Sequence, residues 1–339
     1  MKTTEKPTKT SDPAAIQVTQ VVPQGQVSPL LSLPGNGMAQ LRSDALWLWA
    51  GTPLEVKKKL PLSQPCGMGL LADGSLLAIE KPPQLAGNVR LHRLSVSGEP
   101  LQVLEDHLPV PFDGRMHIEA GEPDGFLTAF RDRSTVLREY RLDTKLGIVL
   151  RRSLELSVPQ ALPTLVRFPS GALAWYDPST QIISVRPTGQ LEASRLGTVP
   201  HPIGFLASGP SADQLWASGP AGELYLLVLS PTLRVVQTVS TGLPHVFHLS
   251  ARGDQVAVLG LHSLPSPGHG WTVALFDATG KERWHQSLLS PSGNFGFQDR
   301  YVALTESAVV VGGSVDLMAW RRTDGQLIPV SETISATAK

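Results

Sequence analysis

Many short apolar runs, frequent Gly and Pro residues, and a turn that recurs about every 45 residues predict an all-β chain, folded as a β-propeller of seven four-stranded antiparallel blades. The 339 residues include 31 Gly and 29 Pro, spread along the chain rather than clustered, which is the punctuation of many short strands. No long amphipathic helical pattern is visible. We expect residues 27–332 to form a single propeller between two tails, residues 1–26 and residues 333–339.

The N-terminal tail is rich in Thr, Lys, Pro and Gln, a composition that buries too little apolar surface to order itself. Within it, Ile16 to Val22 is a candidate strand, and whether such a strand completes the last blade is left open by the sequence. The tail has no apolar signal-peptide core, and no stretch of about 18 apolar residues occurs anywhere. We therefore expect a cytoplasmic protein that does not bind membranes.

Two classes of turn alternate along the chain and define the blades. Turns of the first class are followed directly by an apolar strand: Asp73-Gly74, Asp124-Gly125, Ser170-Gly171, Ala212-Asp213, Gly253-Asp254 and Glu306-Ser307. Turns of the second class are expected between third and fourth strands: Gly51-Thr52, Ser97-Gly98, Thr144-Lys145, Thr188-Gly189, Pro231-Thr232, Thr279-Gly280 and Asp324-Gly325. Positions 51, 98, 145, 189, 231, 280 and 325 are separated by 47, 47, 44, 42, 49 and 45 residues, the length of a four-stranded blade.

The tryptophans support this division into blades. A four-stranded sheet cannot bury both of its faces alone, so blades pack radially and a large aromatic side chain fills the gap between neighbours. Six of the seven Trp residues fall in the expected middle strands: Trp47, Trp49, Trp175, Trp216, Trp271 and Trp320.

The most specific motif is the run from Val273 to Trp284, Val-Ala-Leu-Phe-Asp-Ala-Thr-Gly-Lys-Glu-Arg-Trp. Through Ala274, Asp277, Gly280 and Trp284 it resembles the repeat of quinoprotein-type propellers. In that family the small residue and the turn glycine allow close blade packing, and the tryptophan docks against the next blade. The resemblance implies a structural role for these four residues. The architecture is also WD40-like, although no Trp-Asp pair ends any blade.

No cofactor is expected. Quinoprotein dehydrogenases are secreted and hold calcium, and many stack a vicinal disulfide on the quinone, whereas this chain has one cysteine, Cys66, and no secretion signal. A single cysteine also excludes an intrachain disulfide and a thiolate zinc cluster. No phosphate-binding loop, dinucleotide fingerprint or Gly-x-Ser-x-Gly elbow is present.

The best candidates for metal chemistry are His117 and Glu119, which share one face of a strand and could take part in a site at the channel mouth. This pair is the basis of an alternative function, that of a metal-dependent propeller lyase or lactonase. Two ligands on one strand are too few for a closed site unless other blades contribute. His245 and His248 are three residues apart, which on a regular strand places them on opposite faces.

The charge balance favours a protein partner over nucleic acid. The chain carries 29 basic and 29 acidic side chains and a formal net charge of zero, which argues against binding driven by phosphate neutralisation. Propeller faces are broad, rigid and built from loops, which suits partner binding. We therefore expect a monomeric, non-enzymatic protein–protein interaction scaffold, and a bacterial regulatory complex is one setting in which such a subunit occurs.

Overall fold

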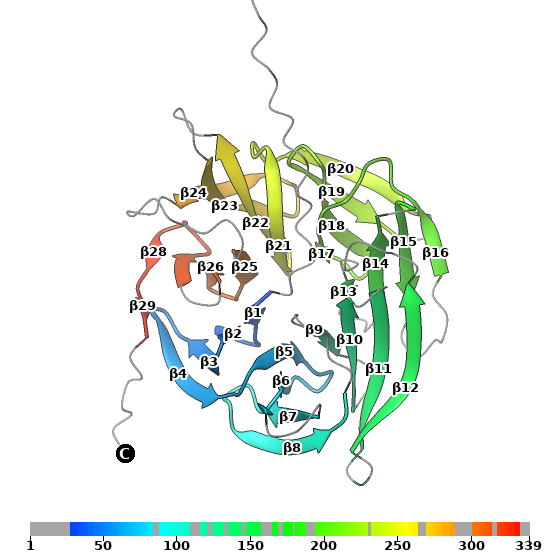
Figure 1. The fold of residues 1–339 in the computed structure, drawn as a ribbon. Coiled ribbons are helices and arrows are strands. Elements are labelled where there is room, and N and C mark those ends of the chain that lie inside the picture. Colours follow the sequence, from blue (N-terminus) through cyan, green and yellow to red (C-terminus); the bar gives the residue numbers. More distant parts are fainter. Residues whose placement is uncertain are drawn as a thin grey trace, which may run out of the picture.

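The computed structural model describes residues 28–83, 88–108, 116–120, 124–131, 135–143, 145, 147–156, 165–168, 172–178, 180–187, 194–229, 232–263, 269–288, 300–313 and 317–332. These residues form seven blades of four strands each, which confirms the predicted fold (Figure 1). The first strand of each blade lies nearest the centre of the ring and the fourth lies at the rim. No helix among the described residues is long and apolar enough to cross a membrane.

The strands follow one another blade by blade. Blade 1 consists of β1 (Leu30–Ser32), β2 (Gly37–Leu41), β3 (Ala45–Ala50) and β4 (Leu54–Pro61); blade 2 of β5 (Pro65–Leu70), β6 (Leu76–Glu80), β7 (Val89–Leu94) and β8 (Pro100–Asp106); blade 3 of β9 (Met116–Ala120), β10 (Gly125–Arg131), β11 (Thr135–Asp143) and β12 (Gly147–Leu156); blade 4 of β13 (Leu165–Arg167), β14 (Leu173–Asp177), β15 (Ile182–Arg186) and β16 (Ser194–Thr198). Blade 5 consists of β17 (Leu206–Ser208), β18 (Gln214–Ser218), β19 (Glu223–Val228) and β20 (Arg234–Ser240); blade 6 of β21 (His245–Arg252), β22 (Gln255–Ser263), β23 (His269–Asp277) and β24 (Glu282–Leu288); blade 7 of β25 (Tyr301–Leu304), β26 (Ala308–Gly312), β27 (Leu317–Arg321) and β28 (Leu327–Ile328); a last strand, β29 (Val330–Ser331), follows.

The predicted turns fall where the repeat requires them. Where the structure describes them, first-class turns lie between the first and second strands of a blade and second-class turns between the third and fourth; Ser170-Gly171, Thr188-Gly189, Thr144 and Pro231 lie outside the described residues. Successive strands in a blade are antiparallel, so in a regular blade both classes of turn meet at the same face of the ring. We call this the turn face.

The apolar core is divided among the blade interfaces. Within the described residues, each of the seven interfaces has its own buried apolar cluster. All six middle-strand tryptophans lie on second or third strands, and they pack in or against these interfaces, as predicted. Blades therefore bury against their neighbours rather than around a common centre.

The ring closes through the C-terminal end of the described chain. The fourth strand of blade 7, β28, has only two residues, and the chain then crosses to blade 1, where β29 pairs in parallel with β4. The amide of Leu54 donates to the carbonyl of Pro329 (3.0 Å), and Arg42 forms an ion pair with Glu332 (2.6 Å). This junction of blades 7 and 1 is called the seam below. The candidate strand Ile16 to Val22 lies outside the described residues.

Blades 2 and 3 are joined differently from the others. Their innermost strands, β5 and β9, pair in parallel, so the two blades share one eight-stranded sheet. Gly67 and Gly69 permit this approach, because a Cβ on Gly69 would lie 2.4 Å from the carbonyl oxygen of Ile118. Glycine inside a strand is typical of such a close backbone contact.

A β-bulge recurs in the fourth strand of blades 1 to 6. In each case the pairing with the third strand skips one residue of the fourth. The skipped residues are Lys57, Leu101, Arg151, Leu196, Val236 and Arg283. A bulge re-aims the side chain of the extra residue. Three of these residues are basic and three are apolar.

Candidate functional site

Of the four residues singled out in the motif from Val273 to Trp284, Ala274, Gly280 and Trp284 lie at the interfaces of blade 6, and Asp277 stabilises the turn between β23 and β24. Ala274 is buried on β23 against blade 5. Asp277 ends β23, and its carboxylate accepts hydrogen bonds from the amides of Thr279 (3.0 Å) and Lys281 (3.1 Å). Gly280 has φ +72°, and a Cβ there would lie 2.2 Å from Val239 of blade 5. The turn therefore packs tightly against the preceding blade.

At the interface of blades 6 and 7, Trp284 is the residue on which the turn of the following blade packs. Its indole Nε1 donates to the carbonyl of Arg322 in blade 7 (3.0 Å). A Cβ on Gly325, in the blade 7 turn, would lie 2.8 Å from Cδ2 of the Trp284 ring. Gly98 of blade 2 meets Leu48 of blade 1 in the same way. The turn between third and fourth strands thus rests on the preceding blade at several interfaces.

For the candidate metal ligands, the structure describes the backbone pairing but not the side chains. His117 and Glu119 lie on β9 opposite Ala129 and Leu127, which are two positions apart on β10. This pairing is regular, as the sequence predicted, while the side chains of the pair lie outside the described part. Among the side chains that are described, no three His, Cys, Asp or Glu residues are grouped as a metal site.

The prediction for His245 and His248 was wrong, because a bulge lies between them. The pairing of β21 with β22 skips Phe247, so the two histidines oppose Leu261 and Leu259, which share one face. His248 Nδ1 accepts a hydrogen bond from the amide of Val302 (3.3 Å). The ring of His248 also packs edge-on against Phe205 and Tyr301. This histidine therefore links the inner strands of blades 6 and 7.

Two buried carboxylates elsewhere are fully paired. Glu80 of blade 2 is 4% exposed and contacts Arg90 (3.2 Å) and His92 (3.0 Å). Glu139 of blade 3 is 2% exposed and forms an ion pair with Arg186 of blade 4 (3.1 Å). Such pairing offsets the cost of burying a charge, so both clusters have a structural explanation.

A pocket of about 460 Å³, lined by polar and charged residues, opens at the turn face beside the seam. Three blades contribute to it, and its lining consists of Thr52, Gln255, Arg283, Glu306, Ser307, Arg321, Arg322 and Thr323. We call it the seam pocket. The hydroxyls of Thr52 in blade 1 and Ser307 in blade 7 are 3.2 Å apart, so the pocket spans the noncovalent junction of the ring.

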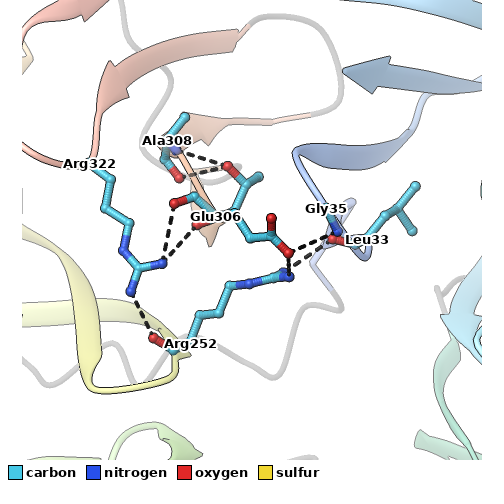
Figure 2. A network of polar contacts seen from close by, with 7 residues as sticks. Leu33, Gly35, Arg252, Glu306, Ala308 and Arg322 are labelled. Carbon is cyan, nitrogen blue, oxygen red and sulfur yellow. Dashed lines mark hydrogen bonds and ion pairs between the residues drawn. The ribbon is translucent and has the colours of Figure 1, made fainter. Parts of the chain in front are cut away.

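Arg322 holds the wall of the seam pocket together (Figure 2). Its guanidinium donates to the carbonyl oxygens of Arg252 (3.1 Å), Thr305 (3.4 Å) and Glu306 (3.4 Å), and to the side chain of Gln255. Partial burial lowers the pKa of this guanidinium, which remains charged because an arginine does not lose its proton in proteins. Arg322 therefore ties the first turns of blades 6 and 7 together.

Arg252 and Glu306 form a second layer of the same network. One Glu306 carboxylate oxygen accepts hydrogen bonds from Arg252 (2.9 Å) and from the amide of Gly35 in blade 1 (3.1 Å). Arg252 also donates to the carbonyl of Leu33 (3.1 Å). Figure 2 shows these groups converging from three blades. The charge of Glu306 is thus already balanced within the fold.

The other two arginines of the seam pocket are half-exposed. Arg283 is the bulge residue of β24, and its guanidinium lies 3.7 Å from the carboxylate of Asp277. Arg321 ends β27 and contacts Asp324 at 2.9 Å. Their side chains are 49% and 46% exposed. Ion pairs as exposed as these contribute little to stability, so both guanidiniums can exchange partners.

Four exposed apolar side chains lie at the rim of blade 2 and on the adjoining strand of blade 3. Leu101 and Val103 point to solvent from β8 and are 58% and 50% exposed, and Val96 in the preceding turn is 43% exposed. Leu150, 51% exposed, lies on the adjoining strand β12 of blade 3. We call these four residues the apolar rim.

Comparison with solved structures shows the architecture alone. The fold is that of a seven-bladed β-propeller, and WD40 propellers are among its structural neighbours. The WD40 β-propeller domain of Doa1 matches with a TM-score of 0.55 and 13% identity, over 87% of this chain and 92% of that one. Kluyveromyces lactis Hsv2 matches with a TM-score of 0.59 and 9% identity, over 89% and 98%.

A third neighbour carries an enzyme name. A putative 6-phosphogluconolactonase from Bacteroides uniformis matches with a TM-score of 0.56 and 12% identity, over 88% of this chain and 97% of that one. No protein-family model and no curated protein matches the sequence. At these identities the similarity extends to the fold and not to activity.

Sequence reasoning missed both surfaces. The seam pocket combines residues from positions 52 to 323, and nothing in a linear pattern brings them together. The apolar rim depends on a bulge at Leu101, which alternation alone does not reveal. The sequence did contain a signal for the contacts between blades, because the turns at Gly98, Gly280 and Gly325 each have a glycine where the turn packs on the preceding blade.

Proposed function

We propose that this protein is a non-enzymatic interaction scaffold whose rigid ring presents binding surfaces to a protein partner. The observation that carries the proposal is the apolar rim. Leu101, Val103 and Leu150 are each about half exposed or more, although Leu104 and Ile148 of the same strands are partly buried against the interface of blades 2 and 3. Apolar side chains this exposed on two neighbouring strands favour a surface that a partner covers.

We propose a cytoplasmic location, because a chain with one cysteine, Cys66, can form no intrachain disulfide and suits a reducing compartment. This sole cysteine is buried, and burial raises the pKa of its thiol to about 12. A protonated, buried thiol is inert toward oxidation and exchange.

The experiment is quantitative affinity purification from the native host with a rim variant, Leu101→Asp with Val103→Asp. The wild-type protein is expected to recover a stoichiometric partner that the rim variant loses. Val236→Asp is the matched control, because Val236 is also a bulge residue with 44% exposure, on the distant blade 5. Equal recovery with the rim variant and the control would contradict the proposed role of the rim.

The alternative of a metal-dependent lyase or lactonase rests on the register of His117 and Glu119 and has a separate test, described in the Discussion. A lactonase among the structural neighbours is compatible with that alternative through fold alone.

A further inference from the structure

The lining of the seam pocket has an excess of positive charge. It contains three arginines, Arg283, Arg321 and Arg322, against one carboxylate, Glu306, so the lining alone carries 3 − 1 = +2. Glu306 is engaged by Arg252, which lies behind the lining. Outside the lining, Asp254, Asp277 and Asp324 lie 3.8, 3.7 and 2.9 Å from Arg322, Arg283 and Arg321, so an anion enters the pocket by exchanging with these partners.

The three arginines differ in what they can offer a ligand. Arg322 uses its donors on backbone carbonyls and on Gln255, so it fixes the wall and contributes charge at close range. Arg283 and Arg321 are half-exposed and held by surface ion pairs, and Arg321 also donates to the side chain of Gln326 (3.2 Å). An incoming acid can replace these pairs at small cost, because the guanidinium fork binds a carboxylate through two parallel hydrogen bonds.

Hydroxyl groups complete the lining. Thr52, Ser307 and Thr323 add short polar side chains that donate and accept. A pocket of about 460 Å³ accommodates one or two amino-acid side chains, and it opens at a face built from turns, where an extended segment has access. The shape therefore suits part of a peptide chain.

We propose that the seam pocket binds the carboxylate of an Asp or Glu side chain in an acidic segment of a partner protein. Arg283 and Arg321 clamp the carboxylate, and the Thr52, Ser307 and Thr323 hydroxyls hydrogen-bond around it. This assignment rests on the proposed scaffold function and adds a recognition chemistry to it.

The neighbouring aspartates favour a carboxylate over a phosphate. Asp277 lies 3.7 Å from Arg283, and Asp324 lies 2.9 Å from Arg321. Hydrogen bonds, chiefly from the Thr279 side chain to Asp277 and from the Gln326 amide to Asp324, lower the pKa of both carboxyls, so both carry charge at neutral pH. Like charges at this range disfavour a dianion more than a monoanion.

The test is selection of a random-peptide display library on the wild-type protein. Peptides enriched in Asp or Glu are expected, and the double variant Arg283→Ala with Arg321→Ala is expected not to select them. A labelled peptide of the enriched sequence is then titrated by fluorescence anisotropy. Each single Arg→Ala change should raise the dissociation constant of the peptide about tenfold or more, as expected for loss of a charge-assisted hydrogen bond.

Three comparisons make the outcome decisive. Replacing the acidic residues of the selected peptide by Gln or Asn should abolish binding, and replacing them by phosphoserine should weaken it; tighter binding of the phosphoserine peptide would overturn the carboxylate assignment. Arg234→Ala is the matched control, an exposed arginine at the corresponding turn of blade 5. Selection without acidic enrichment, or unchanged selection by the double variant, would also overturn it.

The failure of this inference is distinguishable from failure of the scaffold proposal. If the double variant still recovers the partner from the host while the rim variant loses it, the scaffold stands and the seam pocket does not bind the partner. An unchanged unfolding midpoint of the double variant, compared with wild type, shows that any loss of binding is local.

Discussion

At the scale of single residues, Trp284 joins two blades with one side chain. It is 9% exposed, packs in the apolar cluster of blades 6 and 7, and donates a hydrogen bond across the interface. Its ring also fills the space that Gly325 leaves open. The aromatic body and the polar edge of the indole thus act on the same interface.

Truncating Trp284 is therefore expected to be costly. Trp284→Ala should lower the free energy of unfolding by about 3–5 kcal/mol, measured by chemical denaturation. Trp284→Phe keeps most of the ring but loses the hydrogen bond to Arg322, and should cost about 1 kcal/mol for that bond in addition to the lost volume. An unchanged midpoint for the alanine variant would show that the residue is not a packing residue.

We expect the Asp73 carboxylate to contribute to stability in a way that depends on pH. Partial burial acts to raise the pKa of this carboxyl, but hydrogen bonds from Ser75 and Arg93 outweigh burial and lower the pKa from 3.8 to about 2. A depressed pKa stabilises the fold above the unfolded-state value, and this stabilisation is lost as pH falls from about 4 to about 2.

The measurement is the melting temperature of wild type and of Asp73→Asn across that range of pH. The wild-type protein should be the more stable at neutral pH, and the difference should shrink as the pH falls through the window. A difference that stays constant with pH would contradict the assignment, because Asn retains the acceptor oxygen but never carries the charge.

At the scale of elements, the seam depends on a strand of two residues. A truncation that removes residues 330–339 deletes β29, its pairing with β4 and the Arg42–Glu332 ion pair. We expect a lower melting temperature for this protein. Removing residues 333–339 alone, or residues 1–13, should leave the melting temperature unchanged; if deletion of 330–339 has no effect either, β29 does not stabilise the ring.

The elements also show what the sequence could predict. Turn residues such as Gly98, Gly280 and Gly325 have positive φ and specify their positions locally, so blade number and strand order followed from spacing. The bulges at Leu101, Arg283 and Phe247 could not be predicted, because a bulge reflects packing across strands and changes no residue type. The pairing of β5 with β9 had one signal, the Gly67-Met68-Gly69 sequence, which permits close approach without requiring it.

At the scale of the whole molecule, the open question is whether the ring centre holds a metal. His117 and Glu119 lie on the innermost strand of blade 3, and a propeller collects side chains from every blade. We expect no stoichiometric divalent ion in the protein after dialysis, measured by elemental analysis. A bound ion that is lost in the His117→Ala, Glu119→Ala double variant would instead support the lyase or lactonase alternative.

The position of the seam pocket gives it a second consequence. Six of the seven blade junctions are bridged by the chain between consecutive blades, whereas within the described residues blades 7 and 1 meet through the segment from Pro329 to Glu332 and through side-chain contacts. A ligand that touches both Thr52 and Ser307 binds the closed ring alone, so by mass action it opposes separation of the two blades. Hydrogen exchange at the Leu54 amide, which donates across this junction, would then slow in proportion to the occupancy of the pocket.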